Sequence, residues 1–285
     1  MKISKVLYNS SAFPEVLKEI PNPPKELYIL GSLEPLLQKP SIAVVGSRRV
    51  TPYGRGVTQE LVQSIASHGV VIISGLALGV DAIAHQAALA VGGKTIAVLP
   101  CGLDKPYPAT NRQLARRILE QGGALISEYP EGTEPFPSNF IARNRLVSGL
   151  GNGVLITEAA AKSGTIHTAG FALDQGKSVM AVPGNITSEL SRGTNNLIKA
   201  GASPVTSGQD ILNELGIGEQ LQFKETLGAN AEEAAILTLL QQGTTEASEL
   251  LAMSKLNAAE FNQTLTMLEI TGKIRSIGAG HWTLS

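Results

Sequence analysis

The feature that most constrains the fold is a regular alternation between short apolar runs and longer segments with helical spacing. The apolar runs cover residues 42–46, 70–75, 94–100, 124–129, 153–159 and 178–184. Helices are expected over 54–68, 80–91, 110–121, 138–149, 164–175, 194–200 and 207–214. Strands separated by helices of this length predict βαβ units and a parallel sheet. The runs lack a polar–apolar alternation, which indicates that helices cover both faces of the sheet.

The chain divides by pattern into four segments. Residues 1–40 carry prolines at 14, 21, 23, 24, 35 and 40, and are expected to form an irregular extension with one short strand at LYIL. Residues 41–215 form the alternating region, and 216–230 lose the pattern and are expected to be a linker. Residues 231–285 predict three helices (231–241, 246–253, 257–271) and two short strands, the order of a winged helix-turn-helix.

The predicted fold class is therefore α/β. It combines an extended Rossmann-like, doubly wound and mostly parallel sheet with a small C-terminal winged-helix-like domain. The formal net charge of −1 argues against a protein that is basic overall, although it leaves room for a local basic groove.

Composition also limits the chemistry and the compartment. The single cysteine, Cys101, permits no intrachain disulfide, which fits a reducing compartment. The four histidines are scattered without metal-ligand spacing, so no metal and no cofactor is expected. The N-terminus lacks a signal-peptide pattern and no apolar run is long enough to span a bilayer, so we expect a cytoplasmic protein without membrane insertion.

Candidate ligand-binding loops follow three of the predicted strands. They are GSRR at 46–49, SGLALGVD at 74–81, and TEAAAKSGTIHTAG at 157–170. In a doubly wound sheet, ligands bind beyond the carboxyl ends of the strands, and helix N-termini there favour anions. The usual strand order makes the first and fifth strands neighbours, which would bring the first and third loops together. The candidate residues in these two loops are Gly46, Ser47, Arg48, Arg49, Lys162, Ser163, Gly164 and Thr165.

A third basic element is FIARNRLVSGL at 140–150, whose helix is expected to begin at the same edge of the sheet. It adds Phe140, Arg143, Asn144 and Arg145 to the candidate residues. Phe140 could stack on a base or pack in the core, and the two arginines could line the site or form salt bridges. In the predicted helix at 80–91, Asp81 and His85 are four residues apart, and their side chains are expected to pair in a structural role.

The loops do not match a nucleotide-binding fingerprint. The segment GSRRVTPYG lacks G-x-G-x-x-G, and no Walker lysine pattern is present. In a purely structural interpretation, Gly46 and Gly164 only permit short turns. Two basic glycine loops at one expected switch point favour a ligand site instead.

Several stretches together resemble the DNA-processing protein A family, also called DprA or Smf. They include IAVVGSR (42–48), VIISGLALGVDAIAHQAAL (71–89), GGKTIAVLPCGLDKPYPATN (92–111), FIARNRLVSGL (140–150) and EAAAKSGTIHTAGFALDQGKSVMAVPG (158–184). GTNNLIKAGA (193–202) and TSGQDIL (206–212) continue the resemblance, which spans roughly 40–212. Several motifs in register are more specific than any single glycine loop.

The resemblance implies an extended Rossmann domain that binds single-stranded DNA, protects incoming DNA in natural transformation and helps load the RecA recombinase. It implies a protein that is not an enzyme and that self-associates, so a homodimer is expected. It also implies that Arg48, Lys162 and the segment 143–145 line a basic pocket. The helical domain that often precedes the Rossmann domain in this family is expected to be missing, because residues 1–40 are too few and too rich in proline.

Two other functions remain as alternatives. The LOG-type phosphoribohydrolases share a similar fold and carry P-G-G-x-G-T-x-x-E, whose glutamate is catalytic. Here Gly164-Thr165 align with that motif, but Thr168 stands where the glutamate would be, and Glu158 lies too far upstream. A carboxylate is needed to stabilise oxocarbenium-like charge, so the pattern favours binding without turnover. A carrier of a phosphorylated small molecule would use the same loops.

Two expectations concern assembly and the tail. The segment SVMAVPG and the helix at 208–215 are expected to supply an apolar surface for a two-fold interface. The third tail helix would be the recognition-helix equivalent, but the tail offers only Lys255, Lys273 and Arg275 for phosphate contacts. It is therefore expected to be a protein-interaction module or a weak accessory DNA contact.

Overall fold

The computed structural model describes residues 2–217, 230–278 and 280–284 of the 285-residue chain. The chain forms two compact units with the boundary between Leu215 and Gly216. The predicted linker, 216–230, lies almost entirely outside the described residues.

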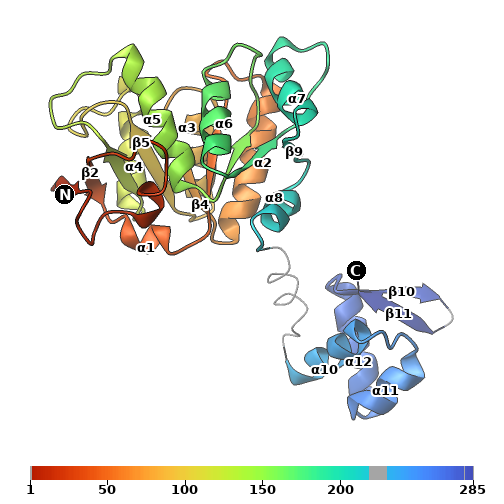
Figure 1. The fold of residues 1–285 in the computed structure, drawn as a ribbon. Coiled ribbons are helices and arrows are strands. Elements are labelled where there is room, and N and C mark those ends of the chain that lie inside the picture. Colours follow the sequence, from red (N-terminus) through yellow and green to blue (C-terminus); the bar gives the residue numbers. More distant parts are fainter. Residues whose placement is uncertain (1, 218–229, 279, 285) are drawn as a thin grey trace. The chain divides into compact units, whose positions relative to one another are not determined.

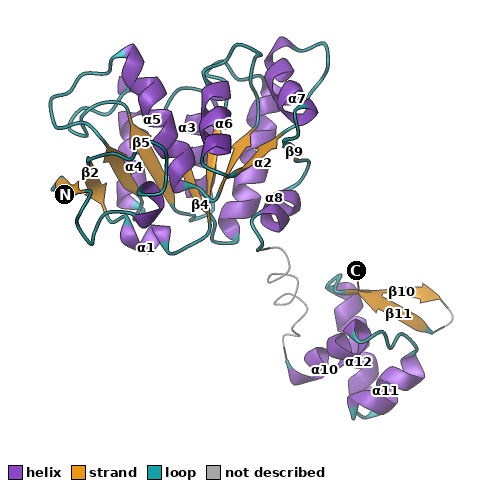
Figure 2. Ribbon diagram, viewed as in Figure 1, coloured by secondary structure: helices purple, strands orange, loops and turns teal. Residues whose placement is uncertain are grey.

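The first unit contains a nine-stranded sheet. Figures 1 and 2 show the sheet at the centre of this unit, between helices. Its order is β1-β2-β6-β5-β4-β3-β7-β8-β9. The strands are β1 (Ser4–Leu7), β2 (Glu26–Gly31), β3 (Ser41–Val45), β4 (Val71–Ser74), β5 (Thr95–Leu99), β6 (Ala124–Ser127), β7 (Gly153–Ile156), β8 (Ser178–Ala181) and β9 (Ser203–Pro204). Strands β3 to β9 pair in parallel, whereas β2 is antiparallel to β1 and β6. The predicted mostly parallel, doubly wound sheet is confirmed.

Helices pack on both faces of this sheet (Figure 2). They are α1 (Glu34–Leu37), α2 (Pro52–Ser67), α3 (Val80–Ala90), α4 (Arg112–Glu120), α5 (Pro137–Leu150), α6 (Thr165–Asp174), α7 (Arg192–Lys199) and α8 (Gly208–Glu214). On one face α2, α3 and α4 pack side by side, and α5 and α6 pack together on the other. Every residue of β3, β4 and β5 is buried, because helices exclude water from both sides.

The N-terminal segment differs from its prediction. Residues 1–40 were expected to form a separate irregular extension, but the structure includes them in the first unit. Strand β1 was missed, and β1 and β2 extend the sheet through antiparallel pairing. Phe13, Leu17 and Ile20 are buried in the main core, where Leu17 and Ile20 approach Gly149 of α5. Each such side chain contributes about 1.5–3 kcal/mol by burial, which is why the prolines do not keep the segment apart.

The predicted two-fold surface is also not an apolar edge. Strand β8 pairs with β9, so SVMAVPG does not end the sheet. The apolar residues of α8, Ile211 and Leu212, are buried in the unit, and α8 packs against α2. The exposed residues of α8 are polar, namely Gln209, Asn213 and Glu214.

The second unit contains α10 (Ala231–Gln241), α11 (Ala247–Ser254), α12 (Ala258–Ile270) and a hairpin of β10 (Ile274–Gly278) and β11 (His281–Leu284). Its own core includes Leu237, Phe261 and Leu268. Asn257 and Glu260 form a capping box that fixes the start of α12. Three helices and a hairpin confirm the predicted winged-helix architecture.

Within the residues that the structure describes, no helix combines the length and the apolar character that crossing a bilayer requires. The same residues contain no group of three or more histidine, cysteine, aspartate or glutamate side chains arranged to hold a metal ion.

Candidate single-strand binding site

A cavity of about 730 Å³ opens at the carboxyl edge of the parallel strands. It is lined by Val45, Gly46, Ser47, Arg48, Arg49, Ala77, Asp81, Tyr107, Pro135, Pro137, Phe140, Ile141, Arg143, Asn144, Ser163, Gly164, Thr165, Thr168 and Leu190. Strand β3 pairs with β7 as predicted, so the loops after these two strands meet at the cavity. The cavity therefore lies at the switch point predicted from the sequence.

The loop after β3 is held by its neighbours on both sides. The Ser47 amide donates to the Glu158 carbonyl (2.7 Å), and the Val80 amide donates to the Ser47 carbonyl (3.1 Å). Gly46 is close to the side chain of Val80, where a Cβ would come within 2.6 Å. This packing fixes the backbone and leaves the side chains of Arg48 and Arg49 exposed at the cavity.

The loop after β7 contributes hydroxyl groups rather than free helix amides. The Thr165 amide donates to the Ser163 hydroxyl (3.2 Å), and the Ile166 amide donates to the Ser163 carbonyl (3.0 Å). The Thr165 hydroxyl donates to the Gly46 carbonyl (3.0 Å), which joins the two loops. Because these amides have partners, attraction of an anion depends mainly on the arginine side chains.

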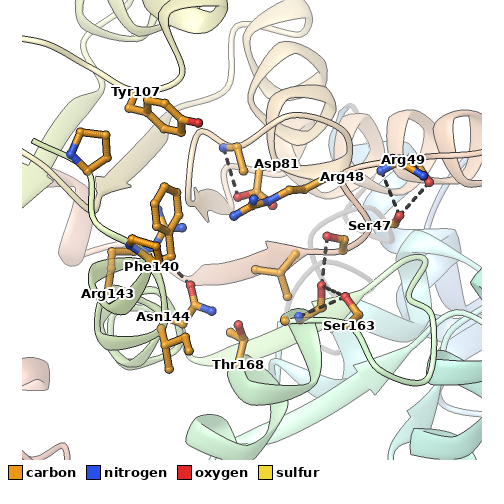
Figure 3. Close-up of a pocket in the computed structure, with 18 of the residues that line it drawn as sticks. Ser47, Arg48, Arg49, Asp81, Tyr107, Phe140, Arg143, Asn144, Ser163 and Thr168 are labelled. Carbon is orange, nitrogen blue, oxygen red and sulfur yellow. Dashed lines mark hydrogen bonds between the residues drawn. The ribbon is translucent and has the colours of Figure 1, made fainter.

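An aromatic wall faces the basic loop. The Arg48 guanidinium lies over the Phe140 ring, 5.1 Å from its centroid. The Tyr107 ring meets Phe140 edge-on at 5.6 Å. Figure 3 shows Arg48 extending between the loop after β3 and these two rings. Phe140 is thus part of the cavity wall and not of the core, and it is placed to contact a flat ligand.

Arg143 and Asp81 form a buried support beneath this wall. Arg143 donates to the carbonyls of Gly75 (2.7 Å) and Val98, and the Asp81 carboxylate accepts from the amides of Gly75 (3.0 Å) and Ala77 (3.4 Å). Burial raises the pKa of Asp81, which the Arg143 charge opposes, and burial lowers the pKa of Arg143. Asp81 thus binds the amide of Gly75 and Arg143 binds its carbonyl, which fixes the backbone at this residue.

The expected pairing of Asp81 with His85 is wrong, because both side chains have other partners. Asp81 binds the loop amides just described. The His85 Nδ1 atom lies 2.6 Å from the Thr95 hydroxyl, which itself donates to the Ile72 carbonyl. The structural role expected for both residues is retained.

Ten of the predicted site residues line the cavity, and Arg145 and Lys162 do not. Arg145 instead forms a two-pronged ion pair with Glu128 (2.7 and 2.9 Å) and donates to the Asn22 carbonyl (3.0 Å). Lys162 is exposed in the loop after β7. Arg143 lines the cavity, but its guanidinium is engaged by backbone carbonyls.

Sequence reasoning missed several lining residues, of which Tyr107 is the most informative. It lies in the loop after β5, the third strand of the alternating pattern, which is not one of the three candidate loops. The signal was available, since β5 is parallel to β4 and its carboxyl end must reach the same edge. Pro135, Pro137 and Ile141 lie at the start of α5 and in the loop before it. No sequence pattern predicted that this loop would line the cavity.

The structure also shows the surroundings of Thr168 and Glu158, the two residues compared above with the catalytic glutamate of the LOG-type enzymes. Thr168 lines the cavity and is buried, and it carries no charge. The Glu158 carboxylate is buried and accepts from the amide and hydroxyl of Thr51 (2.8 and 2.5 Å), next to the start of α2. Glu158 therefore stabilises a helix N-terminus.

Comparison with known proteins gives matches to two families. Residues 4–216 match the family described as DNA recombination-mediator protein A, and residues 224–280 match the DprA winged helix domain. Protein Smf of Escherichia coli is 44% identical over 210 residues, which cover 74% of this chain and 56% of that protein. DNA processing protein DprA of Streptococcus pneumoniae is 43% identical over 202 residues, 71% of each chain.

Solved structures agree with these sequence matches. The X-ray structure of DNA processing protein A from Streptococcus pneumoniae is 42% identical with a TM-score of 0.71, over 75% of this chain and 74% of that one. DNA processing protein A from Helicobacter pylori, described with a single-stranded DNA binding mode, is 36% identical with a TM-score of 0.68, over 75% and 95%. The chain spans about half the length of the first two curated relatives, 56% for Escherichia coli and 52% for Synechocystis.

Proposed function

The chain belongs to the DNA recombination-mediator protein A family, and from this premise we propose that its first unit binds single-stranded DNA. The observation that carries the proposal is a cavity with one basic wall, Arg48 and Arg49, and one aromatic wall, Tyr107 and Phe140. A single strand presents phosphates on one side and unpaired bases on the other, which matches these two walls.

Preference for a single strand over duplex would follow from the shape of the cavity. Arg48 and the Phe140 ring lie in direct contact, 5.1 Å apart. An unpaired strand can offer a base to the rings and a phosphate to the arginines in one cavity, whereas in duplex DNA the base faces are already stacked and paired. Binding of this kind uses no base-edge code and tolerates many sequences.

A titration with single-stranded and duplex oligonucleotides at two salt concentrations tests the proposal. We expect tighter binding of the single strand at both salt concentrations, with affinity falling as salt rises because phosphate contacts release counterions. Equal affinity for the two forms, or affinity that does not depend on salt, would contradict the proposal.

The finer function that we propose is protection of incoming DNA during natural transformation and loading of the RecA recombinase onto the bound strand. Its support is membership of the family and the match to relatives named for DNA processing. Nuclease protection of a bound strand tests the first part. Assembly of RecA on a strand already coated by single-strand binding protein tests the second, with RecA alone as the control.

We further propose that the protein binds without turnover. Thr168 supplies no carboxylate, Glu158 is engaged with Thr51, and the Asp81 carboxylate accepts from two loop amides. Incubation with nucleoside monophosphates is expected to release no free base. Release that is lost in a cavity variant would instead support the LOG-type alternative.

We also propose a homodimer, because one cavity holds few nucleotides and two joined cavities would increase avidity. The apolar residues of α8 are buried within the unit and β8 is paired with β9, so an interface in this region would use polar side chains such as Gln209 and Asn213. Sedimentation over a range of concentrations measures the state, and a monomer mass that does not change with concentration would contradict it.

A further inference from the structure

A second cavity, of about 610 Å³, opens at the same edge of the sheet. Three segments line it, at the start of α2, after β7 and after β8. Their lining residues are Thr51, Pro52, Tyr53, Glu158, Pro183, Gly184, Asn185, Ser188 and Ser191. Strands β3, β7 and β8 are consecutive parallel neighbours, so their carboxyl ends lie side by side. The volume falls within the range of small-ligand pockets, which is about 300–1,000 Å³.

The two cavities adjoin one another along the chain. After β3, Arg49 lines the first cavity and Thr51 the second. Before α7, Leu190 lines the first cavity and the next residue, Ser191, lines the second. Neighbouring residues of two segments thus line the two cavities, which places the cavities side by side at the edge of the sheet.

The second cavity differs from the first in charge. Among the described residues that line it there is no lysine or arginine, and Glu158 is the charged one. The Glu158 carboxylate is 1% exposed and is bound by the Thr51 amide and hydroxyl. The cavity therefore suits an uncharged part of a ligand better than a phosphate.

An aromatic ring is fixed in its wall. Tyr53 is 50% exposed, and its hydroxyl donates to the Pro183 carbonyl (2.7 Å), which ties the start of α2 to the loop after β8. That loop is itself held, because the Asn195 amide group exchanges two hydrogen bonds with the Gly184 backbone (3.1 and 3.0 Å). A ring held in this way loses little conformational entropy when a ligand stacks on it.

We propose that the second cavity receives a nucleobase of the bound strand, stacked on Tyr53, at least one nucleotide beyond those in the first cavity. This inference rests on the proposed single-strand function. It gives the bound strand a path along the edge of the sheet, from the loop after β5 to the loop after β8. Stacking on an aromatic ring accepts any base, because every base has a π-face. An uncharged lining is compatible with such a contact.

A ladder of oligothymidylates of increasing length tests the inference, measured with the full chain and with Tyr53→Ala and Tyr53→Phe. The affinity of the unaltered protein is expected to rise at the length that first fills the second cavity. Tyr53→Ala should lose that rise, by at least about fivefold for longer strands, while shorter strands bind as before. Tyr53→Phe keeps the ring and loses only the hydrogen bond to Pro183, so it should keep most of the rise.

A position scan with 2-aminopurine gives a second readout. Quenching at the position that reaches the second cavity should disappear in Tyr53→Ala and persist in Tyr53→Phe. An equal loss of affinity at all lengths, or an unchanged ladder, would overturn this inference alone. Absence of single-strand binding by the unaltered protein at every length would overturn the proposed function as well.

Discussion

Arg48 and Arg145 show how the surroundings of an arginine decide what it can bind. Arg48 is exposed at the cavity, where its guanidinium lies over the Phe140 ring, and the nearby Asp81 carboxylate is bound to loop amides. Arg145 is half-buried and engaged by Glu128 and by the Asn22 carbonyl. Only the first of these guanidinium groups is available to a phosphate.

Arg48→Ala is expected to weaken single-strand binding and to flatten its salt dependence. Loss of one phosphate contact lowers the slope of log K against log salt by about 0.7 for a single strand. Titration at several salt concentrations measures this slope. Arg145→Ala is the matched control: we expect an unchanged slope and a loss of about 1 kcal/mol in the free energy of unfolding. An unchanged salt slope for Arg48→Ala with a lower slope for Arg145→Ala would show that Arg48 does not contact the DNA.

His85 gives a prediction about pH. Burial lowers its pKa from 6.5 to about 3, with a smaller effect of the Arg143 charge. The Thr95 hydroxyl donates to Ile72, so it accepts from His85 Nδ1–H, and the other ring nitrogen, Nε2, is buried without a hydrogen-bond partner among the described residues. With a pKa of about 3 the ring is neutral at neutral pH. Between pH 6.5 and 3 the unfolded chain binds a proton that the folded protein does not, so stability falls as the pH falls through this window.

At pH 5 this effect amounts to about 2 kcal/mol relative to pH 7.5. Urea unfolding of the unaltered protein and of His85→Asn at both pH values measures it. The asparagine amide can still donate to Thr95 but does not titrate, so the variant should lose about 2 kcal/mol less between the two conditions. Identical pH dependence of the two proteins would show that His85 is not the group responsible.

At the scale of elements, the loop between β4 and α3 is held by side chains from three other places. Asp81 of α3 binds the amides of Gly75 and Ala77, Arg143 of α5 binds the Gly75 carbonyl, and Asn111 donates to the carbonyls of Leu76 and Ala77. The loop ends at Gly79, whose φ of +79° favours glycine. It is therefore rigid, and it supports the loop that presents Arg48.

Gly79→Ala should disturb this arrangement. A Cβ at Gly79 would come within 2.2 Å of the Ser47 carbonyl oxygen, in addition to the unfavourable φ. We expect a loss of at least about 2 kcal/mol in the free energy of unfolding, together with weaker single-strand binding. Gly56→Ala in α2 is the matched control, because a Cβ there meets nothing within 4 Å. It should gain about 0.5–1 kcal/mol and bind normally. Thermal or urea unfolding and one titration compare the two variants.

At the scale of the whole molecule, the two units differ in charge. Residues 1–215 contain 19 lysines and arginines against 16 aspartates and glutamates, whereas residues 216–285 contain 4 against 8. In the described part of the second unit, Lys273 is paired with Glu233 at 2.7 Å, which further reduces the charge available to phosphate. The outer face of α12 presents Asn262, Gln263 and Glu269. This unit is therefore poorly suited to be the main DNA contact.

A chain that ends at Leu215 is expected to keep most of the single-strand affinity. The first unit contains the whole cavity and its own core, so it should remain folded. Fluorescence anisotropy with a labelled strand compares it with the full chain, and circular dichroism and sedimentation control for fold and association. If binding disappears while fold and association are intact, the binding site lies in the second unit.

The sequence by itself determined most elements of the alternating region and of the tail, and their order, but not strand β1. Strand and helix signals are local, and parallel pairing then requires the loops after β3 and β7 to meet at one edge, which is why seven candidate residues of these two loops line one cavity. Only the tertiary structure decided which cations remain available, because partners lie far apart in the chain: Arg143 binds Gly75, and Glu158 binds Thr51. It also decided that Phe13 and Leu17 belong to the core and that Tyr107 reaches Phe140. Such contacts depend on packing between distant segments, which local periodicity does not encode.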